Sequence, residues 1–293
     1  MYFTGIGDEA GNSIDSQIKA LKVLGWTHLE ARNVEVDGFA KSNLHDLPDP
    51  AFDIVADKLE EAGIQVCCFG SAIANWGKKI NEPFDSSLAE ARRAIPRMKR
   101  LGTHIVRIMS FAVDETEDQR AAERFRRLRE LTGMFRDAGL QPLHENCMNY
   151  GGMGWKFTQE LLSEVPGLNL LFDTANPIFN ADRIQPKPWP KQDPWEFYDH
   201  VKDHIAHVHV KDAIWNPAKN DADYTYPGEG DGQVRRILTD LLGRGYDAGI
   251  SIEPHLAVVF HDASVQSNEL KMFETFVEYG QRLMKMVNEI KPT

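Results

Sequence analysis

Four side chains that can bind a metal ion follow apolar stretches in the second half of the sequence. They are Glu145, Asp173, His209 and Glu253, and each stands at the end of a short run typical of a buried β-strand. More than a hundred residues separate the first from the last. They can meet only if their strands lie side by side in one sheet. We therefore predict that these four side chains together hold one divalent cation.

The residue types in this set indicate which metal would bind. Three carboxylates and one imidazole make an oxygen-rich site, which favours Mn²⁺ or Mg²⁺ and also accommodates Co²⁺ or Zn²⁺. No cysteine belongs to the set, so metals that prefer thiolate ligands are disfavoured. Without the cation, three buried carboxylates would repel one another, and one or more would take up a proton. For any one of these side chains alone, an ordinary salt bridge or helix cap is the competing interpretation.

Glycines that end helical patterns divide the chain into repeating units. Gly25, Gly63, Gly102, Gly139 and Gly245 each follow a helical pattern and precede an apolar strand. Glycine suits the left-handed backbone conformation that commonly ends a helix. Strands that alternate with helices indicate a parallel sheet. The eight expected strands lie at residues 2–6, 28–31, 65–69, 104–109, 141–144, 169–172, 206–210 and 249–252.

Eight alternating units close naturally into an α/β fold of the (β/α)8 type, the TIM barrel, which uses about 250 residues as one domain. We therefore predict a single TIM-barrel domain over residues 1–293. The active site of such a barrel lies at the C-terminal ends of the strands, where the four candidate ligands stand. Ser13 and Asp193 are expected to cap helices. A heavily charged helix is expected over residues 117–138.

The composition excludes several classes of protein. The chain of 293 residues carries a formal net charge of −11, which disfavours a nucleic-acid partner because phosphates attract basic surfaces. No apolar stretch reaches the about 18 residues that a membrane-spanning helix needs. The N-terminal residues show no basic region followed by an apolar run, so no signal peptide is expected. Three cysteines, an odd number, indicate no disulfide framework. We therefore expect a cytoplasmic protein.

The sequence around the candidate ligands resembles the xylose-isomerase-like superfamily of sugar isomerases and epimerases. The matching elements are the glutamate after the fifth strand, Asp173-Thr174, His207-Val208-His209 and Glu253-Pro254-His255. The superfamily includes ketose 3-epimerases, hydroxypyruvate isomerase and inosose dehydratase, and the resemblance extends over the whole chain. It implies that Glu145, Asp173, His209 and Glu253 bind the metal. It also implies that Glu145 and Glu253 are the catalytic acid–base pair.

The resemblance and the residue chemistry together indicate an enzyme that acts on a small-molecule carbohydrate. A divalent ion would stabilise the ene-diolate that arises when a carboxylate removes a proton next to a carbonyl. We expect a metal-dependent isomerase or epimerase of a sugar or keto-sugar. The alternative is a lyase, a dehydratase of a keto-sugar or keto-inositol that uses the same metal site. An apurinic endonuclease of this fold and a non-catalytic binding protein are further alternatives. A homo-oligomer is implied by the resemblance alone.

Other polar and aromatic residues near the expected strand ends are candidates for substrate binding. They are Glu30, Arg107, Asn176, Lys211, Trp215 and His255. A charge at the inner rim of a barrel is costly unless it is paired or used, and an arginine can grip a carboxylate or sugar oxygen at two points. Structural support or a surface position is the alternative for each. Sugar 3-epimerases usually carry a histidine where this chain has Asn176, and often an arginine where it has Trp215. This difference favours a bulkier or oxidised sugar.

Three further features admit two interpretations each. Residues 228–232, Gly-Glu-Gly-Asp-Gly, could cradle a phosphate, or shape the site beside the metal as a Pro-Gly-x-Gly stretch does in the resembling family. Trp76 and other loop tryptophans could stack on a sugar ring or pack within their loops. His144 is expected to be structural, and His207 to support the metal site or to pack beneath it.

Overall fold

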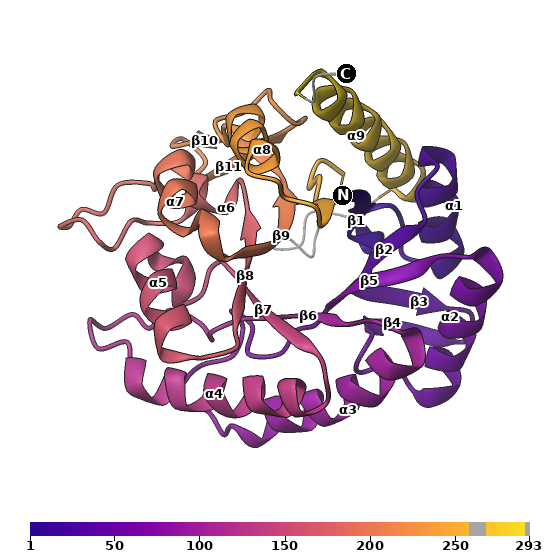
Figure 1. The fold of residues 1–293 in the computed structure, drawn as a ribbon, viewed down its shortest axis with the longest axis horizontal. Coiled ribbons are helices and arrows are strands. Elements are labelled where there is room, and N and C mark those ends of the chain that lie inside the picture. Colours follow the sequence, from indigo (N-terminus) through magenta and orange to yellow (C-terminus); the bar gives the residue numbers. More distant parts are fainter. Residues whose placement is uncertain (258–267, 291–293) are drawn as a thin grey trace.

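An eight-stranded parallel sheet curves into a barrel at the centre of the molecule (Figure 1). The structure is a computed structural model that describes residues 1–257 and 268–290. The barrel strands are β1 (Tyr2–Gly5), β2 (His28–Ala31), β5 (Gln65–Gly70), β6 (Ile105–Ile108), β7 (Gln141–Glu145), β8 (Asn169–Asp173), β9 (Ile205–Val210) and β12 (Gly249–Ile252). They pair in parallel in the order β1-β12-β9-β8-β7-β6-β5-β2. The predicted TIM barrel is confirmed.

Strands β1 and β2, at the two ends of this order, nearly close the barrel. Thr4 Oγ1 donates a hydrogen bond to the carbonyl oxygen of His28 over 2.9 Å. Ile6 forms an isolated parallel bridge to Glu30. Because the strands are parallel and almost encircle one axis, their C-terminal ends surround a common space.

Helices surround the barrel (Figure 1). They are α1 (Ile14–Leu24), α2 (Asp49–Ala62), α3 (Asp85–Leu101), α4 (Ala121–Asp137), α5 (Trp155–Glu164), α6 (Asn176–Phe179), α7 (Pro194–Val201), α8 (Val234–Gly243) and α9 (Glu269–Ile290), with short 3₁₀ helices η1 (Gly7–Glu9), η2 (Gly151–Met153) and η3 (Lys202–His204). Both predicted caps are confirmed, because Ser13 Oγ accepts from Ser16 N over 3.1 Å and Asp193 Oδ1 accepts from Glu196 N over 2.8 Å. Within the described residues, none of the helices is long and apolar enough to cross a membrane.

The charged helix expected over residues 117–138 begins later than predicted, at the start of α4. The preceding segment is held by its own side chains. Gln119 Oε1 accepts from Asp114 N over 2.8 Å, and Asp114 Oδ1 accepts from Thr116 N over 2.9 Å. Such local side-chain bonds offer the backbone an alternative to the helix. The prediction was therefore wrong for the first turn.

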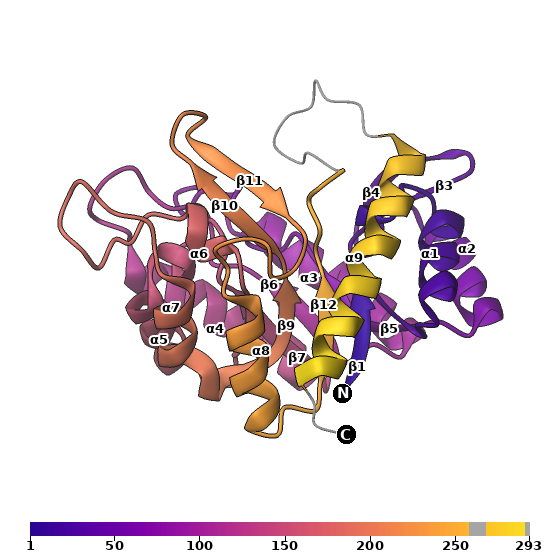
Figure 2. The same ribbon diagram turned by 90° about the horizontal axis from the view of Figure 1, so that it is seen from above.

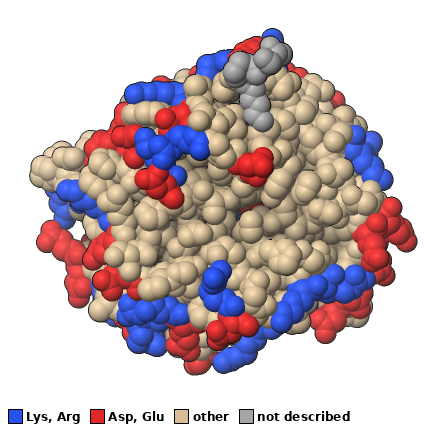
Figure 3. Space-filling model, in the orientation of Figure 1, with Lys and Arg blue, Asp and Glu red and all other residues tan. Residues whose placement is uncertain are grey.

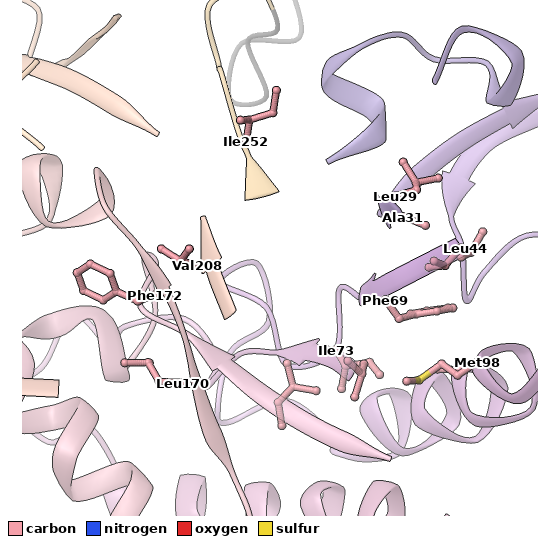
Figure 4. Close-up of a cluster of buried hydrophobic side chains, with 14 of the residues drawn as sticks. Leu29, Ala31, Leu44, Phe69, Ile73, Met98, Leu170, Phe172, Val208 and Ile252 are labelled. Carbon is pink, nitrogen blue, oxygen red and sulfur yellow. The ribbon is translucent and has the colours of Figure 1, made fainter. Parts of the chain in front are cut away.

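The main hydrophobic core lies between the barrel and the helices (Figure 4). Leu170 and Phe172 of β8 and Val208 of β9 are fully buried there, together with Met98 of α3. Alternate residues of a strand point to opposite faces, so Asp173, next to Phe172, faces the barrel interior. Burying each large apolar side chain contributes about 1.5–3 kcal/mol. The outward packing of these strands thereby fixes which side chains point inward.

Two antiparallel hairpins follow barrel strands and were not predicted. One pairs β3 (Asn33–Val36) with β4 (Phe39–Asn43), and the other pairs β10 (Asp212–Asn216) with β11 (Asp221–Thr225). Figure 2 shows β10 and β11 projecting beyond the barrel strands. Both hairpins follow the C-terminal end of a barrel strand, so they extend the walls around the strand ends.

Candidate metal centre

The structure brings the four candidate ligands together inside the barrel. Glu145 ends β7, Asp173 ends β8, His209 lies in β9, and Glu253 follows β12. These four strands are consecutive in the barrel order, so their C-terminal ends stand side by side. One potential ligand atom from each side chain lies within 4.8 Å of the others, and all four residues are buried.

The imidazole of His209 is oriented by a carboxylate beneath it. Its Nε2 donates to Glu30, at 2.9 Å from Oε2 and 3.0 Å from Oε1. Its Nδ1 is buried without a hydrogen-bond partner and lies 3.8 Å from both Glu145 Oε1 and Glu253 Oε2. Burial opposes the charged ring, but Glu30 and Glu145 raise the pKa of His209 to about 10. The hydrogen bonds to Glu30 turn Nδ1 toward Glu145 and Glu253, and without a metal the ring is protonated at neutral pH.

Asp173 turns one carboxylate oxygen toward the cluster, where Lys211 is its ionic partner. Its Oδ1 accepts from the backbone N–H groups of Ala175 and Asn176 over 2.8 and 2.7 Å. Its Oδ2 is buried without a hydrogen-bond partner and lies 3.1 Å from Lys211 Nζ. Burial raises the pKa of Asp173 to about 6, although Lys211 opposes the shift. The backbone bonds fix the carboxylate so that its second oxygen faces the cluster.

Glu145 is held from two sides. Its Oε2 accepts from Arg107 Nη1 over 3.0 Å, and its Oε1 accepts from Asn176 Nδ2 over 3.2 Å. Burial works against the ionised form, but Arg107 and His209 lower the pKa of Glu145 to about 2. The carboxylate is therefore ionised and fixed in place, as a metal ligand or a general base must be.

Glu253 is held by two cationic side chains, Arg32 and Lys211. Its Oε1 accepts from Arg32 Nη1 over 2.8 Å, and its Oε2 accepts from Lys211 Nζ over 2.9 Å. Arg32 also donates to Asp8 and Glu9. Burial opposes ionisation, yet Lys211 and the neighbouring cations hold the pKa of Glu253 well below its usual range. Asp8 and Glu9, which follow β1, thus hold Arg32 where it can bind Glu253, which follows β12.

The donor atoms of this cluster fit a divalent cation. Asp173 Oδ2 and His209 Nδ1 are both buried polar atoms without hydrogen-bond partners, and such atoms are costly unless something pairs with them. The raised pKa of His209 reflects the same need for positive charge among carboxylates. Three carboxylates with one imidazole suit Mg²⁺, Mn²⁺ or Zn²⁺.

A cavity of about 540 Å³ opens beside the cluster and is lined by Glu145 and Glu253. Four of the six predicted substrate-binding residues also line it, namely Arg107, Asn176, Lys211 and His255. His255 Nδ1 lies 2.9 Å from Glu9 Oε1, and its backbone N–H donates to Glu9 Oε2 over 3.1 Å. These four residues therefore face the space beside the cluster.

The other two predicted substrate residues do not line this cavity. Glu30 lies beneath it, fully buried, and accepts from His207 Nε2 over 3.1 Å as well as from His209. Trp215 packs against a small apolar cluster and stacks under Lys191, whose Nζ lies 3.6 Å from the ring centroid. Direct substrate contact is not supported for either residue. For Glu30 the position fits support of the metal ligand.

Several cavity residues were missed because they come from elements that the sequence analysis did not predict. Asn43 ends β4, Tyr224 lies in β11, and Phe179 ends α6. Residues 221–225 alternate polar and apolar side chains strictly, Asp-Ala-Asp-Tyr-Thr, and that period indicates a strand. This signal could have located Tyr224.

The glycine-rich segment at 228–232 surrounds a carboxylate of the chain itself. Asp212 accepts from the backbone N–H groups of Gly228, Gly230 and Gly232 over 2.8, 3.1 and 2.9 Å. A Cβ atom on Gly230 would lie 2.4 Å from Asp212 Oδ1, so the loop needs glycine there. Asp212 therefore occupies the place that a phosphate would take, and the phosphate interpretation is wrong.

Comparisons with known proteins agree with this architecture. Residues 18–275 match the family model described as Xylose isomerase-like TIM barrel. An inosose dehydratase from Lacticaseibacillus casei is 23% identical over 266 residues, covering 84% of this chain and 76% of the relative. The solved IolI protein with a binding zinc atom has a TM-score of 0.73 at 15% identity and covers 100% of both chains. A xylose isomerase-like TIM barrel protein from Mycobacterium smegmatis in complex with magnesium has a TM-score of 0.67 at 17% identity, covering 99% of this chain and 97% of that one. Because the family match spans most of the sequence, this chain belongs to the xylose isomerase-like TIM-barrel family.

Proposed function

We propose that this protein is a divalent-metal-dependent isomerase or epimerase of a sugar or keto-sugar. The observation that carries the proposal is the placement of Glu145 and Glu253. Each has a carboxylate oxygen 3.8 Å from the free Nδ1 of His209, and both line the cavity. Two ionised carboxylates on one small site can remove a proton from a substrate carbon and return it at another position or face.

The chain's own residues supply the positioning and the proton transfer. Arg107 and Lys211 keep the two glutamates ionised and fixed. Asp173 and His209 complete the set of four metal ligands. A bound divalent ion, for which we propose Mn²⁺ or Mg²⁺, supplies Lewis-acid stabilisation of the negative charge that develops on the substrate oxygens. One glutamate takes the proton next to the carbonyl, and either it returns that proton itself or the other glutamate, after taking up a proton from solvent, donates one.

A second candidate function is dehydration of a keto-sugar or keto-inositol. The observation that favours it is the similarity to an inosose dehydratase over 84% of this chain. The first step is the same, because a glutamate removes the proton next to the carbonyl. The glutamate that has taken the proton then donates it to the hydroxyl group on the next carbon. That hydroxyl leaves as water and a carbon–carbon double bond forms.

One experiment distinguishes these outcomes. The protein is incubated with Mn²⁺ in D₂O and a panel of ketoses, keto-acids and keto-inositols, and each mixture is followed by NMR. Deuterium on a substrate carbon with a rearranged sugar supports isomerisation or epimerisation. Loss of water with an enone product supports dehydration. If no carbon-bound hydrogen in the whole panel exchanges with solvent above the rate without protein, the proposal is rejected.

A further inference from the structure

Two large apolar side chains are exposed at the cavity that contains the candidate metal centre. Trp76, in the loop after β5, is 45% exposed, and Met148, in the loop after β7, is 44% exposed. Both line the cavity of about 540 Å³, and both also line an adjoining cavity of about 370 Å³. They therefore stand between the metal centre and a second hollow.

The loop that carries Trp76 is firmly anchored in this position. Backbone N–H groups of Met109 and Phe111 donate to the carbonyl oxygens of Ile73 and Ala74 over 3.1 and 2.7 Å. Ala74 has a φ of 54°, a left-handed conformation that is unfavourable for a residue with a Cβ atom. Strained backbone of this kind persists only where its surroundings hold it, and it is concentrated at functional sites.

A partly buried ion pair reinforces the same loop. Lys78 Nζ donates to the Ala72 carbonyl oxygen over 2.6 Å and to Glu90 Oε1 over 2.7 Å. The backbone N–H of Ala112 donates to the Lys78 carbonyl oxygen over 2.8 Å. The loop is thus fixed to its neighbour on both sides of Trp76, and the indole is held at the surface by a rigid support.

The loop that carries Met148 is attached directly to the metal ligand Glu145. Asn149 Nδ2 donates to the Glu145 carbonyl oxygen over 3.0 Å, and Asn149 Oδ1 accepts from Ser110 Oγ over 2.9 Å. Asn149 also forms an isolated antiparallel bridge with Ala112. The backbone N–H of Ala112 also donates to Lys78 in the Trp76 loop. Hydrogen bonds through Ala112 therefore connect the loops that carry Trp76 and Met148.

Further apolar and aromatic side chains line the same cavity. They are Met109, Cys147, Phe179 and Tyr224. Figure 3 shows the opposite face of the molecule, at the N-terminal ends of the strands, where charged side chains lie mainly around the periphery. Trp76 and Met148 are the large apolar side chains exposed at this cavity among the described residues, and contiguous exposed apolar surface is a feature of ligand-binding grooves.

The cavity is in the size range of sites that bind drug-sized ligands. Such sites have volumes of about 300–1,000 Å³, and the cavity beside the metal centre has about 540 Å³. Because Glu145, Glu253, Trp76 and Met148 all line this one cavity, it has room for a ligand that extends from the two glutamates to the indole and the thioether.

We propose that the substrate is a keto-sugar that carries an aromatic or other flat apolar substituent, as an aryl glycoside with a ketone on its sugar ring does. The sugar lies at the carboxylates, and the substituent lies between Trp76 and Met148. A flat ring gains both apolar burial and offset stacking against an indole, and a methionine adapts to its edge. This inference rests on the proposed function and adds the part of the substrate that does not react.

Binding of matched glycosides tests the inference without requiring turnover. The probes are the methyl and 4-nitrophenyl β-glycosides of glucose, galactose and xylose, with 4-nitrophenol alone as a reference. Each is titrated at up to millimolar concentration into the Mn²⁺-loaded protein, and binding is followed by calorimetry or by NMR. For at least one sugar, the aryl glycoside is expected to bind about tenfold or more tightly than the methyl glycoside and than 4-nitrophenol.

Two variants test whether Trp76 and Met148 cause the preference for aryl over methyl glycosides, and a third variant is the matched control. Trp76→Ala and Met148→Ala are each expected to reduce the ratio of aryl to methyl affinity to about threefold or less. Trp189→Ala is the control, because Trp189 is packed between Arg183 and Lys187 and lines neither of the two cavities. That variant is expected to keep the wild-type ratio.

The possible outcomes separate this inference from the proposed function. Equal affinity of the two glycosides of every sugar, no binding of any aryl glycoside, or a ratio unchanged by both variants overturns the inference. Mn²⁺ affinity and exchange of substrate hydrogen with D₂O test the proposed function independently of this ratio. If the protein prefers aryl glycosides but neither binds Mn²⁺ nor catalyses exchange, the inferred binding site for the aryl group stands. The proposed enzymatic function is then rejected.

Discussion

His209 Nε2 lies 2.9 Å from Glu30 Oε2, and this hydrogen bond joins two fully buried side chains from opposite parts of the sequence. A carboxylate acts only as an acceptor when ionised, so Nε2 carries a proton and Nδ1 is the nitrogen whose lone pair becomes available to a metal when the ring is neutral. Partners of this kind fix the tautomer and orientation of a metal-binding histidine and make it a better ligand. Glu30 therefore determines which nitrogen of His209 faces the other three ligands.

Replacing Glu30 with glutamine is expected to weaken binding of Mn²⁺ by about 10–100-fold, because the imidazole loses its ionised partner. The measurement is calorimetric titration of the metal-free protein. Glu35→Gln is the matched control, since Glu35 is an exposed residue of β3, and its affinity is expected to equal that of the wild type. An unchanged affinity in the Glu30 variant would show that this hydrogen bond does not support a metal ligand.

Replacing Glu253 with glutamine is expected to reduce exchange of carbon-bound substrate hydrogen with D₂O by at least about 100-fold, since the amide cannot accept the proton. The comparison is made at saturating Mn²⁺, determined by titration for each protein, and circular dichroism checks that the fold persists. Glu35→Gln again serves as the control. Exchange at the wild-type rate would remove Glu253 from the chemistry.

Replacing Asp212 with asparagine is expected to lower the free energy of unfolding by about 1–3 kcal/mol. One carboxylate oxygen becomes an NH₂ group, which cannot accept from the backbone N–H groups of the glycine-rich loop. Urea denaturation measures the change. Asp231→Asn is the control, because Asp231 is exposed in the same loop. Equal stability of both variants would contradict a structural role for the Asp212 carboxylate.

His144 predicts a specific loss of stability in acid. It is buried, its Nε2 donates to Asn149 Oδ1 over 3.1 Å, and its Nδ1 lacks a hydrogen-bond partner. Burial lowers the pKa of His144 to about 4 from an ordinary value of 6.5. The unfolded chain takes up the proton first as pH falls. His144 therefore contributes stability that is fully present above about pH 6.5 and is lost as pH falls towards about 4.

The size of this loss is about 3 kcal/mol at most, by the linkage between protonation and folding. The measurement is urea denaturation of the metal-free protein from neutral pH to about pH 4. His144→Gln lacks the titrating group, so its stability is expected to fall less steeply over this range than that of the wild type. Parallel pH profiles for the two proteins would show that His144 is protonated equally in the folded and unfolded states.

The barrel was predictable because its signals are local. Gly25 has a φ of 70°, and its N–H bonds the carbonyl oxygens of Leu21 and Lys22. The same ending closes α2 and α3. Each helix end of this kind is specified by a few neighbouring residues, and so is each apolar run that follows. Strand positions β2 and β12 were predicted to the residue for this reason.

The hairpins were not predictable in the same way. Neither was expected from the sequence, and the second supplies Tyr224 to the cavity. Trp215 lies in β10, the other strand of that hairpin. Its position in the hairpin leaves it outside the cavity and not beside the substrate as expected. Short polar strands have little hydrophobic pattern, so their pairing depends on contacts that form only in the folded molecule.

The sequence by itself determined each of the eight strand ends to within one residue, and therefore that Glu145, Asp173, His209 and Glu253 share one end of a barrel. Residue type and strand register are local properties. In a parallel barrel all strands end on the same face, so a residue at a strand end lies on that face. Only the tertiary structure decided that Glu30 lies beneath His209 and not in the cavity, and that Trp76 and Met148 share one wall. These relationships join segments that are distant in the chain, and they depend on side-chain direction and close packing, which no local pattern encodes.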